Sequence, residues 1–273
     1  MDDKAWGIRI EDLSGGYGGR LILEHFTAAM PGGSITAILG ESGCGKTTLL
    51  RMLLGLTPAT AGSIFIGGRD TTHMAPRQFH KLRRRFGVLF QDGALISALT
   101  LAENTELPLM EHTRLPRKVL REAALRTLEL VGLRKFADFY PGELSGGMRK
   151  RAGLARAIVT EPPVLFCDEP TSGLDPITAA QMDQLLLDMK SCYPQMTIVV
   201  VTHDLDSMVR IADEVLVLKD KKAVFSGRKD ELQRSADPYI RSLLDRRFEE
   251  SRRMAAPPLD ESVRNALSAW LDA

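Results

Sequence analysis

One short segment of the chain, Gly40–Thr47, has residue types and spacing suited to binding phosphate. It follows the pattern G-x-x-x-x-G-K-[ST], whose glycines let the backbone curl so that several N–H groups point at one anion. Lys46 can reach the outer phosphates as a point charge, and the hydroxyl of Thr47 can ligate Mg²⁺. We therefore predict a phosphate-binding loop (P-loop), rather than a glycine-rich turn that binds nothing. Its predicted contact residues are Gly40, Glu41, Ser42, Gly43, Cys44, Gly45, Lys46, Thr47 and Thr48.

Two adjacent carboxylates, Asp168 and Glu169, follow the apolar run Val164–Cys167. Successive side chains of a strand point to opposite faces, so the two carboxylates start in different directions and suit different roles. We predict that Asp168 holds Mg²⁺ and that Glu169 accepts a proton from a water that attacks the terminal phosphate. An acidic pair after a strand is common, and it becomes informative only together with the P-loop.

Two further polar residues each end an apolar run. His203 follows Val199–Val201, and we predict that it hydrogen-bonds the terminal phosphate and orients Glu169 or the attacking water. The competing interpretation of His203 is a purely structural residue at a strand end. Gln91 closes the run Phe86–Phe90 in the same way, and we predict that it contacts Mg²⁺ or the water.

The segments that must position these residues alternate between strand-like and helical patterns. Strands are expected at Ile8–Glu11, Leu21–Phe26, Ser34–Leu39, Ser63–Ile66, Phe86–Phe90, Val164–Cys167, Thr197–Val201 and Glu214–Leu218. Helices are expected at about Thr48–Gly55, Pro116–Val131, Gly147–Val159, Ile177–Ser191 and Leu205–Ile211. Several of the strands are continuous apolar runs, as in a sheet covered on both faces. The alternation predicts an α/β core with a mainly parallel sheet.

One region, about residues 92–160, breaks the alternation because its pattern is almost wholly helical. This indicates a helical lobe inserted into the α/β core. Within it, Ser145, Gly146 and Gly147 open a helix with a hydroxyl and two glycines, which is a second arrangement suited to binding an anion.

Composition and charge limit the classes of protein that fit. Of the 273 residues, 44% are hydrophobic and 26% are charged, which are ordinary values for a globular protein with a core. The net charge of +1 gives no overall attraction to nucleic acid, so no nucleic-acid partner is expected. The basic run Lys81–Arg85 is best explained as a solvated helix end before a strand.

The cysteines and the lengths of the apolar runs indicate in which cellular compartment the chain is expected. Cys44, Cys167 and Cys192 are far apart and lack the spacing of a metal site, which favours a reduced, cytosolic chain. No run approaches the roughly 18 apolar residues of a membrane span, and the first residues do not read as a signal peptide. We therefore expect any membrane role to come through a partner.

The segment Glu143–Met148 (ELSGGM) resembles the LSGGQ signature of the ATP-binding subunits of ABC transporters. That family also carries the P-loop, the Asp-Glu pair after an apolar strand, a glutamine loop, a D-loop and a switch histidine. All six motifs occur here in order over residues 1 to about 240, with the D-loop at Ser172–Asp175. Tyr17, in Gly15–Gly18, matches the aromatic residue that stacks on adenine, and the alternative for it is a hairpin tyrosine.

The resemblance implies a P-loop NTPase (RecA-like) core with a parallel sheet, an N-terminal antiparallel β subdomain and the inserted helical subdomain. It also implies that ATP and Mg²⁺ bind, with Asp175 of the D-loop among the nucleotide contacts. Two copies would pack head to tail, so that Ser145 and Gly147 of one chain complete the phosphate site of the other. ATP would favour the closed pair, and hydrolysis would release it. The helical lobe would grip a membrane subunit.

Within that family, several segments resemble the Mla/MCE-associated ATPases. They are Phe90–Leu95 (FQDGAL), Leu99–Thr100, Glu103–Asn104, Leu107–Leu109 and Met148–Arg151. The resemblance implies transport of phospholipid or a related lipid across the envelope of diderm bacteria. It further implies an MlaE-type membrane permease, an MCE-domain protein and a STAS-domain regulator as partners, and a peripheral location on the cytoplasmic face of the inner membrane.

Three alternative functions can be compared with the first by the sequence features that each would require. An importer or exporter ATPase for another substrate would carry the same six motifs. A soluble ABC ATPase acting on DNA or ribosomes would show a long coiled-coil insertion or two cassettes in tandem, and this chain has one cassette and no heptad run. A nucleotide-gated scaffold would not need the base Glu169.

The last part of the chain reads as a separate tail, so we predict domains at 1–245 and 246–273. The mixed-charge run Arg246–Arg253 and the pair Pro257–Pro258 precede an apolar stripe at helical spacing, with Asp260 placed to cap its N-terminus. The stripe consists of Leu259, Val263, Leu267, Trp270 and Leu271. A helix this short must pack against something, either this domain's own core or a partner.

Overall fold

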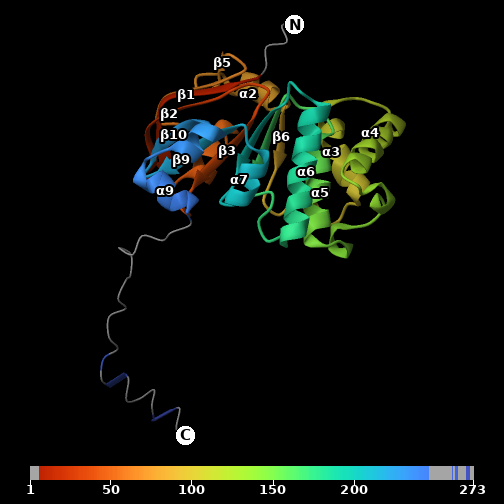
Figure 1. The fold of residues 1–273 in the computed structure, drawn as a ribbon. Helices are drawn as coiled ribbons and strands as arrows, with labels where there is room; N and C mark the ends of the chain where they lie inside the picture. Colours follow the sequence, from red (N-terminus) through yellow and green to blue (C-terminus); the bar gives the residue numbers. More distant parts are fainter. Residues whose placement is uncertain (1–5, 246–259, 261, 264–268, 271–273) are drawn as a thin grey trace. The chain divides into compact units, whose positions relative to one another are not determined.

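The computed structural model describes residues 6–245, 260, 262–263 and 269–270 (Figure 1). The chain divides into two compact units, Met1–Arg234 and Ser235–Ala273. The first unit contains both sheets and most of the helices (Figure 1). The predicted boundary at residue 245 stays a prediction.

The central sheet has six strands in the order β10-β9-β3-β8-β7-β6. Its strands are β3 (Ile35–Gly40), β6 (Phe86–Leu89), β7 (Val164–Asp168), β8 (Thr197–Val201), β9 (Glu214–Lys219) and β10 (Lys222–Arg228). All neighbours are parallel except β9 and β10, which pair antiparallel. The carboxyl ends of β3, β8, β7 and β6 therefore meet at one edge of the sheet, which is where ligands bind in open α/β sheets.

A second sheet has four antiparallel strands in the order β2-β1-β4-β5. Its strands are β1 (Ile8–Tyr17), β2 (Arg20–Met30), β4 (Ala61–Ile66) and β5 (Arg69–Asp70). The predicted antiparallel β subdomain and the mainly parallel core are thus confirmed. β1 runs beyond the predicted Glu11 because its last residues pair with β2 through irregular register shifts.

Helices cover the central sheet and form the inserted lobe (Figure 1). The helices of the first unit are α1 (Lys46–Leu53), α2 (Pro76–Arg83), α3 (Leu101–His112), α4 (Arg117–Leu130), α5 (Gly146–Ile158), α6 (Pro176–Cys192), α7 (Leu205–Ile211) and α8 (Lys229–Arg234). Two 3₁₀ turns, Arg134–Phe136 and Pro141–Glu143, lie between α4 and α5. The basic run at residues 81–85 spans the end of α2, where Leu82 is buried and its basic neighbours are exposed, as expected for a solvated helix end.

The strands β7 and β8 show why the central sheet is buried on both faces. Their successive side chains enter two different core clusters, as the period of two of a strand requires. One cluster holds Leu165, Cys167, Ile198 and Val200, and the other holds Val164, Phe166, Val199 and Val201. The first cluster also contains residues of α5 and α6, and the second contains residues of α1 and the antiparallel sheet. The sheet therefore lies between the helices on one side and the antiparallel sheet with α1 on the other.

None of the helices in the described part of the chain combines the length and apolar character that crossing a membrane requires. In the second unit, α9 (Pro238–Leu244) begins where the carboxylate of Asp237 accepts the N–H groups of Tyr239 and Ile240. Asp260 accepts the N–H of Ser262 at 2.9 Å, in the capping position that its sequence place predicts. Of the predicted apolar stripe, Val263 and Trp270 are exposed. Its other members, Leu259, Leu267 and Leu271, lie outside the described residues, as do residues 246–253 and 257–258.

Candidate active site

The P-loop joins the end of β3 to the start of α1. Gly40, Gly43 and Gly45 have φ angles of 151°, 80° and 114°, which L side chains rarely adopt. At Gly40 a Cβ would also lie 2.5 Å from the carbonyl oxygen of Leu218 in β9. The loop conformation therefore requires glycine at these positions.

The charged and polar groups of this loop converge where α1 begins. The side chain of Lys46 is only 8% exposed, and its Nζ donates to the carbonyl oxygens of Gly40 at 2.7 Å and Glu41 at 2.9 Å. Among the described residues, the N–H groups of Lys46, Thr47 and Thr48 donate to no main-chain carbonyl, as is usual in the first turn of a helix, and the N–H of Lys46 bonds to the thiol of Cys44. The N–H groups of Thr47 and Thr48, the helix N-terminus and the ammonium group of Lys46 together fit a phosphate anion.

Tyr17 is joined to the helix that follows the P-loop. Its hydroxyl is 2.9 Å from Oγ1 of Thr57, and the guanidinium carbon of Arg51 in α1 lies 5.6 Å from the centre of its ring. The side chain is 44% exposed, and the residue ends β1 beside the turn Gly18–Gly19. Tyr17 is thus a hairpin tyrosine by position, and its ring is placed next to α1. Stacking on adenine stays a prediction.

Glu169 and His203 come together after the ends of neighbouring strands β7 and β8. The N–H of Glu169 donates to the carbonyl of Val201 at 2.9 Å, which holds the two strand ends side by side. Nδ1 of His203 lies 2.8 Å from Oε2 of Glu169. The two atoms are within ion-pair distance. Oε2 of Glu169 is a buried oxygen that accepts no hydrogen bond from the described residues, so it can accept a proton or a water.

The carboxyl group of Asp168 interacts electrostatically with Lys46 of the P-loop. Burial raises the pKa of its carboxyl above the usual value, the negative charge of Glu169 raises it further, and the positive charge of Lys46 lowers it. A carboxylate held in this setting is a candidate ligand for a cation, which would offset its burial. No cluster of three or more His, Cys, Asp or Glu side chains able to hold a metal occurs in the described ranges. The predicted Mg²⁺ site does not need one, because Mg²⁺ commonly binds one carboxylate, a hydroxyl, substrate phosphates and waters.

Gln91 follows β6 and opens a loop that is fastened to α5. Arg156 of α5 donates to the carbonyls of Gly93 and Ala94, both at 2.7 Å. A Cβ at Gly153, one turn earlier on α5, would lie 2.8 Å from Cα of Gly93, so the helix and the loop pack in direct backbone contact. Gln91 itself is exposed. Its contact with Mg²⁺ or water stays a prediction.

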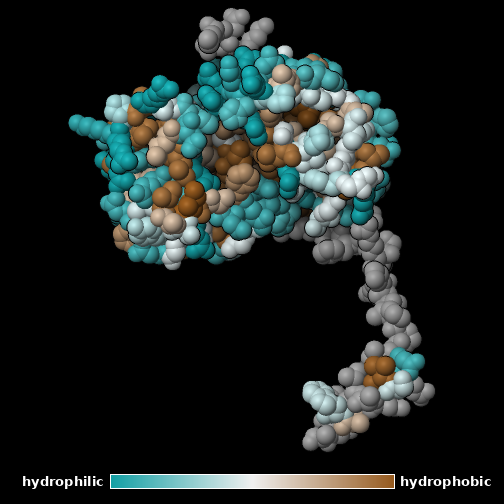
Figure 2. All heavy atoms as spheres, turned by 180° about the vertical axis from the view of Figure 1, so that it is seen from behind, coloured by the Kyte–Doolittle hydropathy of each residue, from teal (hydrophilic) through white to brown (hydrophobic). Residues whose placement is uncertain are grey.

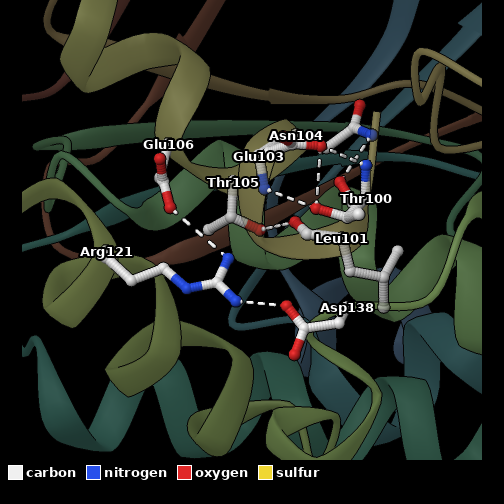
Figure 3. A network of polar contacts seen from close by, with 8 residues as sticks. All are labelled: Thr100, Leu101, Glu103, Asn104, Thr105, Glu106, Arg121 and Asp138. Carbon is white, nitrogen blue, oxygen red and sulfur yellow. Dashed lines mark hydrogen bonds and ion pairs between the residues drawn. The ribbon is translucent and has the colours of Figure 1, made fainter. Parts of the chain in front are cut away.

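The segment that follows this loop is bonded to α3. Asn104 is fully buried; its Oδ1 accepts the N–H of Ile96 at 2.7 Å, and its Nδ2 donates to the carbonyls of Ile96, Leu99 and Thr100. Thr100 and Glu103 form a reciprocal cap at the start of α3. In Figure 3, Arg121 of α4 reaches both Glu106 of α3 and Asp138, which ties the helices of the lobe together.

The signature and the D-loop begin helices of their own. Oγ of Ser145 accepts the N–H of Met148 at 3.2 Å and so caps α5. Asp175 caps α6 by accepting the N–H groups of Ile177 and Thr178, both at 3.1 Å. Hydrogen bonds from the side chain and then the N–H of Thr178 are the main causes that lower the pKa of its carboxyl. Gly146 is exposed, while a Cβ at Gly147 would lie 2.6 Å from Cγ2 of Thr178. Within the described residues, no hydrogen bond or ion pair joins Ser145, Gly147 or Asp175 to the P-loop.

Sequence reasoning missed one residue beside this site, Lys150. It is buried in α5 and contacts the backbone of the Glu169 turn. Helical spacing was the available signal: Lys150 lies three residues from both Gly147 and Gly153, which places it on the face of α5 that is buried.

Cys44 allows a direct test of the loop. Burial raises the pKa of its thiol above the usual value, although the charge of Lys46 opposes this. Since the thiolate is the reactive form, alkylation should be slow near pH 7.5 and should rise by about tenfold per pH unit up to the raised pKa. Mass spectrometry of the Cys44 peptide measures the rate, and the exposed Cys192 is the internal control. Prebound ATP should protect Cys44; labelling that ATP leaves unchanged would contradict its place in the nucleotide site.

Comparison with known proteins agrees with this geometry. Residues 23–172 match the family model of the ABC transporter. The intermembrane phospholipid transport system ATP-binding protein MlaF of Escherichia coli (strain K12) is 41% identical over 238 residues, which cover 87% of this chain and 88% of MlaF. The protein named "Probable ribonucleotide transport ATP-binding protein mkl" of Mycobacterium leprae (strain TN) is 40% identical over 240 residues, 88% of this chain and 69% of that protein.

A solved dimeric ATP-binding cassette, in a post-hydrolysis state bound to ADP and Pi, superposes with a TM-score of 0.73 and 30% identity. The superposition covers 81% of this chain and 98% of that one. The family match extends over the P-loop, the signature and the Asp-Glu pair. The chain therefore belongs to the ABC transporter family, as one of its nucleotide-binding ATPases.

Proposed function

We propose that this chain is the ATP-hydrolysing motor subunit of a transporter that moves phospholipid or a related lipid across a bacterial envelope. The observation that carries the proposal is the match to MlaF, which extends over nearly the whole length of both proteins. The segments Phe90–Leu95 and Met148–Arg151 add to it, because they resemble the Mla/MCE-associated branch.

The proposed hydrolysis assigns one role to each group at the sheet edge. Lys46 and the N–H groups at the start of α1 hold the phosphates of ATP. Glu169 takes a proton from water as the water oxygen bonds to the terminal phosphorus and the bond to the β–γ bridging oxygen breaks, giving ADP and phosphate. His203 orients Glu169 or the water. When bound, Mg²⁺ neutralises phosphate charge, and Thr47, Gln91 and Asp168 are the residues that would hold it.

A second copy of the chain completes the site in this proposal. The signature and D-loop residues Ser145, Gly147 and Asp175 do not bond to the P-loop of their own chain. A head-to-tail dimer would bring them to the phosphates bound by the partner. The dimeric form of the solved cassette supports this arrangement.

A membrane permease is the second proposed partner. A groove of about 410 Å³ lies where β6, α3 and α5 meet, with Phe86, Phe90, Ile96 and Pro108 among its apolar lining residues and Arg156 at its side. Phe90 and Ile96 are 40% and 47% exposed, and Figure 2 shows apolar side chains reaching the surface among polar ones. In this proposal the groove receives the permease, and the chain is a peripheral subunit on the cytoplasmic face of the inner membrane. An MCE-domain protein and a STAS-domain regulator are further proposed partners.

Reconstitution tests the proposal. The chain is co-expressed with a candidate MlaE-type permease from the same organism, purified, and placed in liposomes that contain a fluorescent phospholipid. We expect the permease to stimulate ATP hydrolysis and ATP to drive phospholipid transfer to acceptor vesicles, with Lys46→Ala as the inactive control. ATP-driven uptake of ribonucleotide with no lipid transfer would instead favour the function in the name of the mycobacterial relative. Hydrolysis that no membrane partner changes would contradict a transport motor.

A further inference from the structure

The ammonium group of Lys150 lies where the signature helix meets the turn that carries Glu169. Lys150 is 5% exposed and stands on α5, five residues after Ser145. Its Nζ donates to two main-chain carbonyl oxygens, that of Glu169 at 3.1 Å and that of Ser172 at 2.5 Å. Ser172 is the first residue of the D-loop, so one side chain contacts both the base residue and the D-loop.

The turn that Lys150 contacts has an unusual backbone. Glu169 has a φ angle of 49°, in the left-handed region that residues with a side chain rarely adopt. The N–H of Ser172 donates to the carbonyl of Glu169 at 3.2 Å, so that this oxygen accepts two donors. The direction of the Glu169 side chain therefore depends on a strained turn, and Lys150 supplies two of the hydrogen bonds that hold it.

The ammonium group of Lys150 interacts with two acidic side chains near the site, Asp92 and Glu169. Burial lowers the pKa of its ammonium group, while the negative charges of Asp92 and Glu169 favour the protonated form. A buried ammonium needs hydrogen-bond partners, and Lys150 finds them in two carbonyls of the Glu169 turn. Removing it would take one donor from each of these carbonyls and leave that of Glu169 with the N–H of Ser172.

We propose that Lys150 is a positioning residue for ATP hydrolysis, which fixes the turn of Glu169 and the D-loop to the signature helix α5. The inference rests on the proposed role of Glu169 as the base. In the proposed dimer, Ser145 at the start of α5 faces the nucleotide of the other chain. Lys150 then couples the signature contact at one site to the orientation of the base at the other.

The first test separates nucleotide binding from turnover. Lys150→Met keeps most of the side-chain volume but removes the charge and the donors. We expect its affinity for ATP to stay within about twofold and its kcat to fall by about 10- to 100-fold, the scale of a misplaced catalytic group. Lys150→Arg should recover most of the loss, because a guanidinium also donates to two carbonyls. The matched control is Arg151→Met, since Arg151 donates instead to Val131 at the end of α4.

The second test asks whether Lys150 acts through Glu169. Single-turnover hydrolysis is compared for Lys150→Met, Glu169→Gln and the double variant. A positioning residue adds no further loss once the base is gone, so the double variant should be as slow as Glu169→Gln alone. A double variant slowed by the full product of the two factors, or a Lys150→Met protein with normal kcat, overturns the proposal. Normal hydrolysis by Glu169→Gln would instead refute the base assignment on which it rests.

A third variant covers the case in which Lys150→Met does not fold or bind ATP. Lys150→Gln retains one donor group, and its kcat should lie below that of Lys150→Arg at equal ATP affinity. Equal turnover by Lys150→Gln and the unmodified protein contradicts the proposal.

Discussion

Lys46→Ala loses ATP binding and ATP hydrolysis together. The ammonium group is buried and bonded to the carbonyls of Gly40 and Glu41, so it is already held at the loop where the phosphates would bind. A hydrogen bond to a charged group contributes about 1.5–3 kcal/mol, or roughly 10- to 150-fold in affinity. Calorimetry with a non-hydrolysable ATP analogue measures the binding, and phosphate release measures the activity.

A stability control accompanies this variant. Removing the donors also leaves the buried carbonyl of Gly40 and the partly buried carbonyl of Glu41 with fewer partners, which costs about 1–3 kcal/mol of the free energy of unfolding. Urea unfolding without nucleotide reports that effect separately, because only the folded fraction enters the binding fit. A folded Lys46→Ala protein that binds ATP with unchanged affinity would show that Gly40–Thr47 is not the phosphate site.

Glu169→Gln has the second large expected effect, and it separates binding from chemistry. Glutamine has the shape of glutamate but cannot accept the proton of the attacking water. We expect ATP affinity to be retained and the hydrolysis rate to fall by about 10²–10⁴-fold, the range of a lost general base. Because hydrolysis opens the proposed dimer, the variant should accumulate as a dimer when ATP is present.

Sedimentation velocity with and without ATP measures the dimer. The double variant Lys46→Ala with Glu169→Gln is the matched control, since it should stay monomeric at any ATP concentration. A Glu169→Gln protein that hydrolyses ATP at the normal rate would falsify the base assignment. One that remains monomeric when saturated with ATP would refute the composite site.

Local sequence patterns were sufficient to predict the functional residues that lie at the ends of buried strands. Asp168 and His203 each follow a run of apolar, partly β-branched residues, and such runs form the buried parallel strands β7 and β8. Their residues could thus be assigned to one edge of the sheet before any contact was known. The strand β10 escaped detection because its side chains alternate between exposed and half-buried. An edge strand of this kind carries little apolar signal.

Contacts between segments that are far apart in the chain could not be predicted from local sequence patterns. Arg156 bonds to Gly93 across 63 positions, and Lys150 reaches Ser172 across 22. Both are cations on a helix whose sequence pattern predicts only that one face is buried. Which carbonyls they meet depends on how α5 packs against the glutamine loop and the Glu169 turn.

Local residue patterns were enough to predict the α/β core, the phosphate-binding loop and the acidic pair at the end of β7, because glycine conformation, strand periodicity and residue chemistry act over a few neighbouring positions. The folded arrangement was needed to find that Nδ1 of His203 lies 2.8 Å from Oε2 of Glu169 and that Lys150 bonds to the Glu169 turn. These distances arise from the packing of elements far apart in the chain, and packing depends on the shape of every side chain between them.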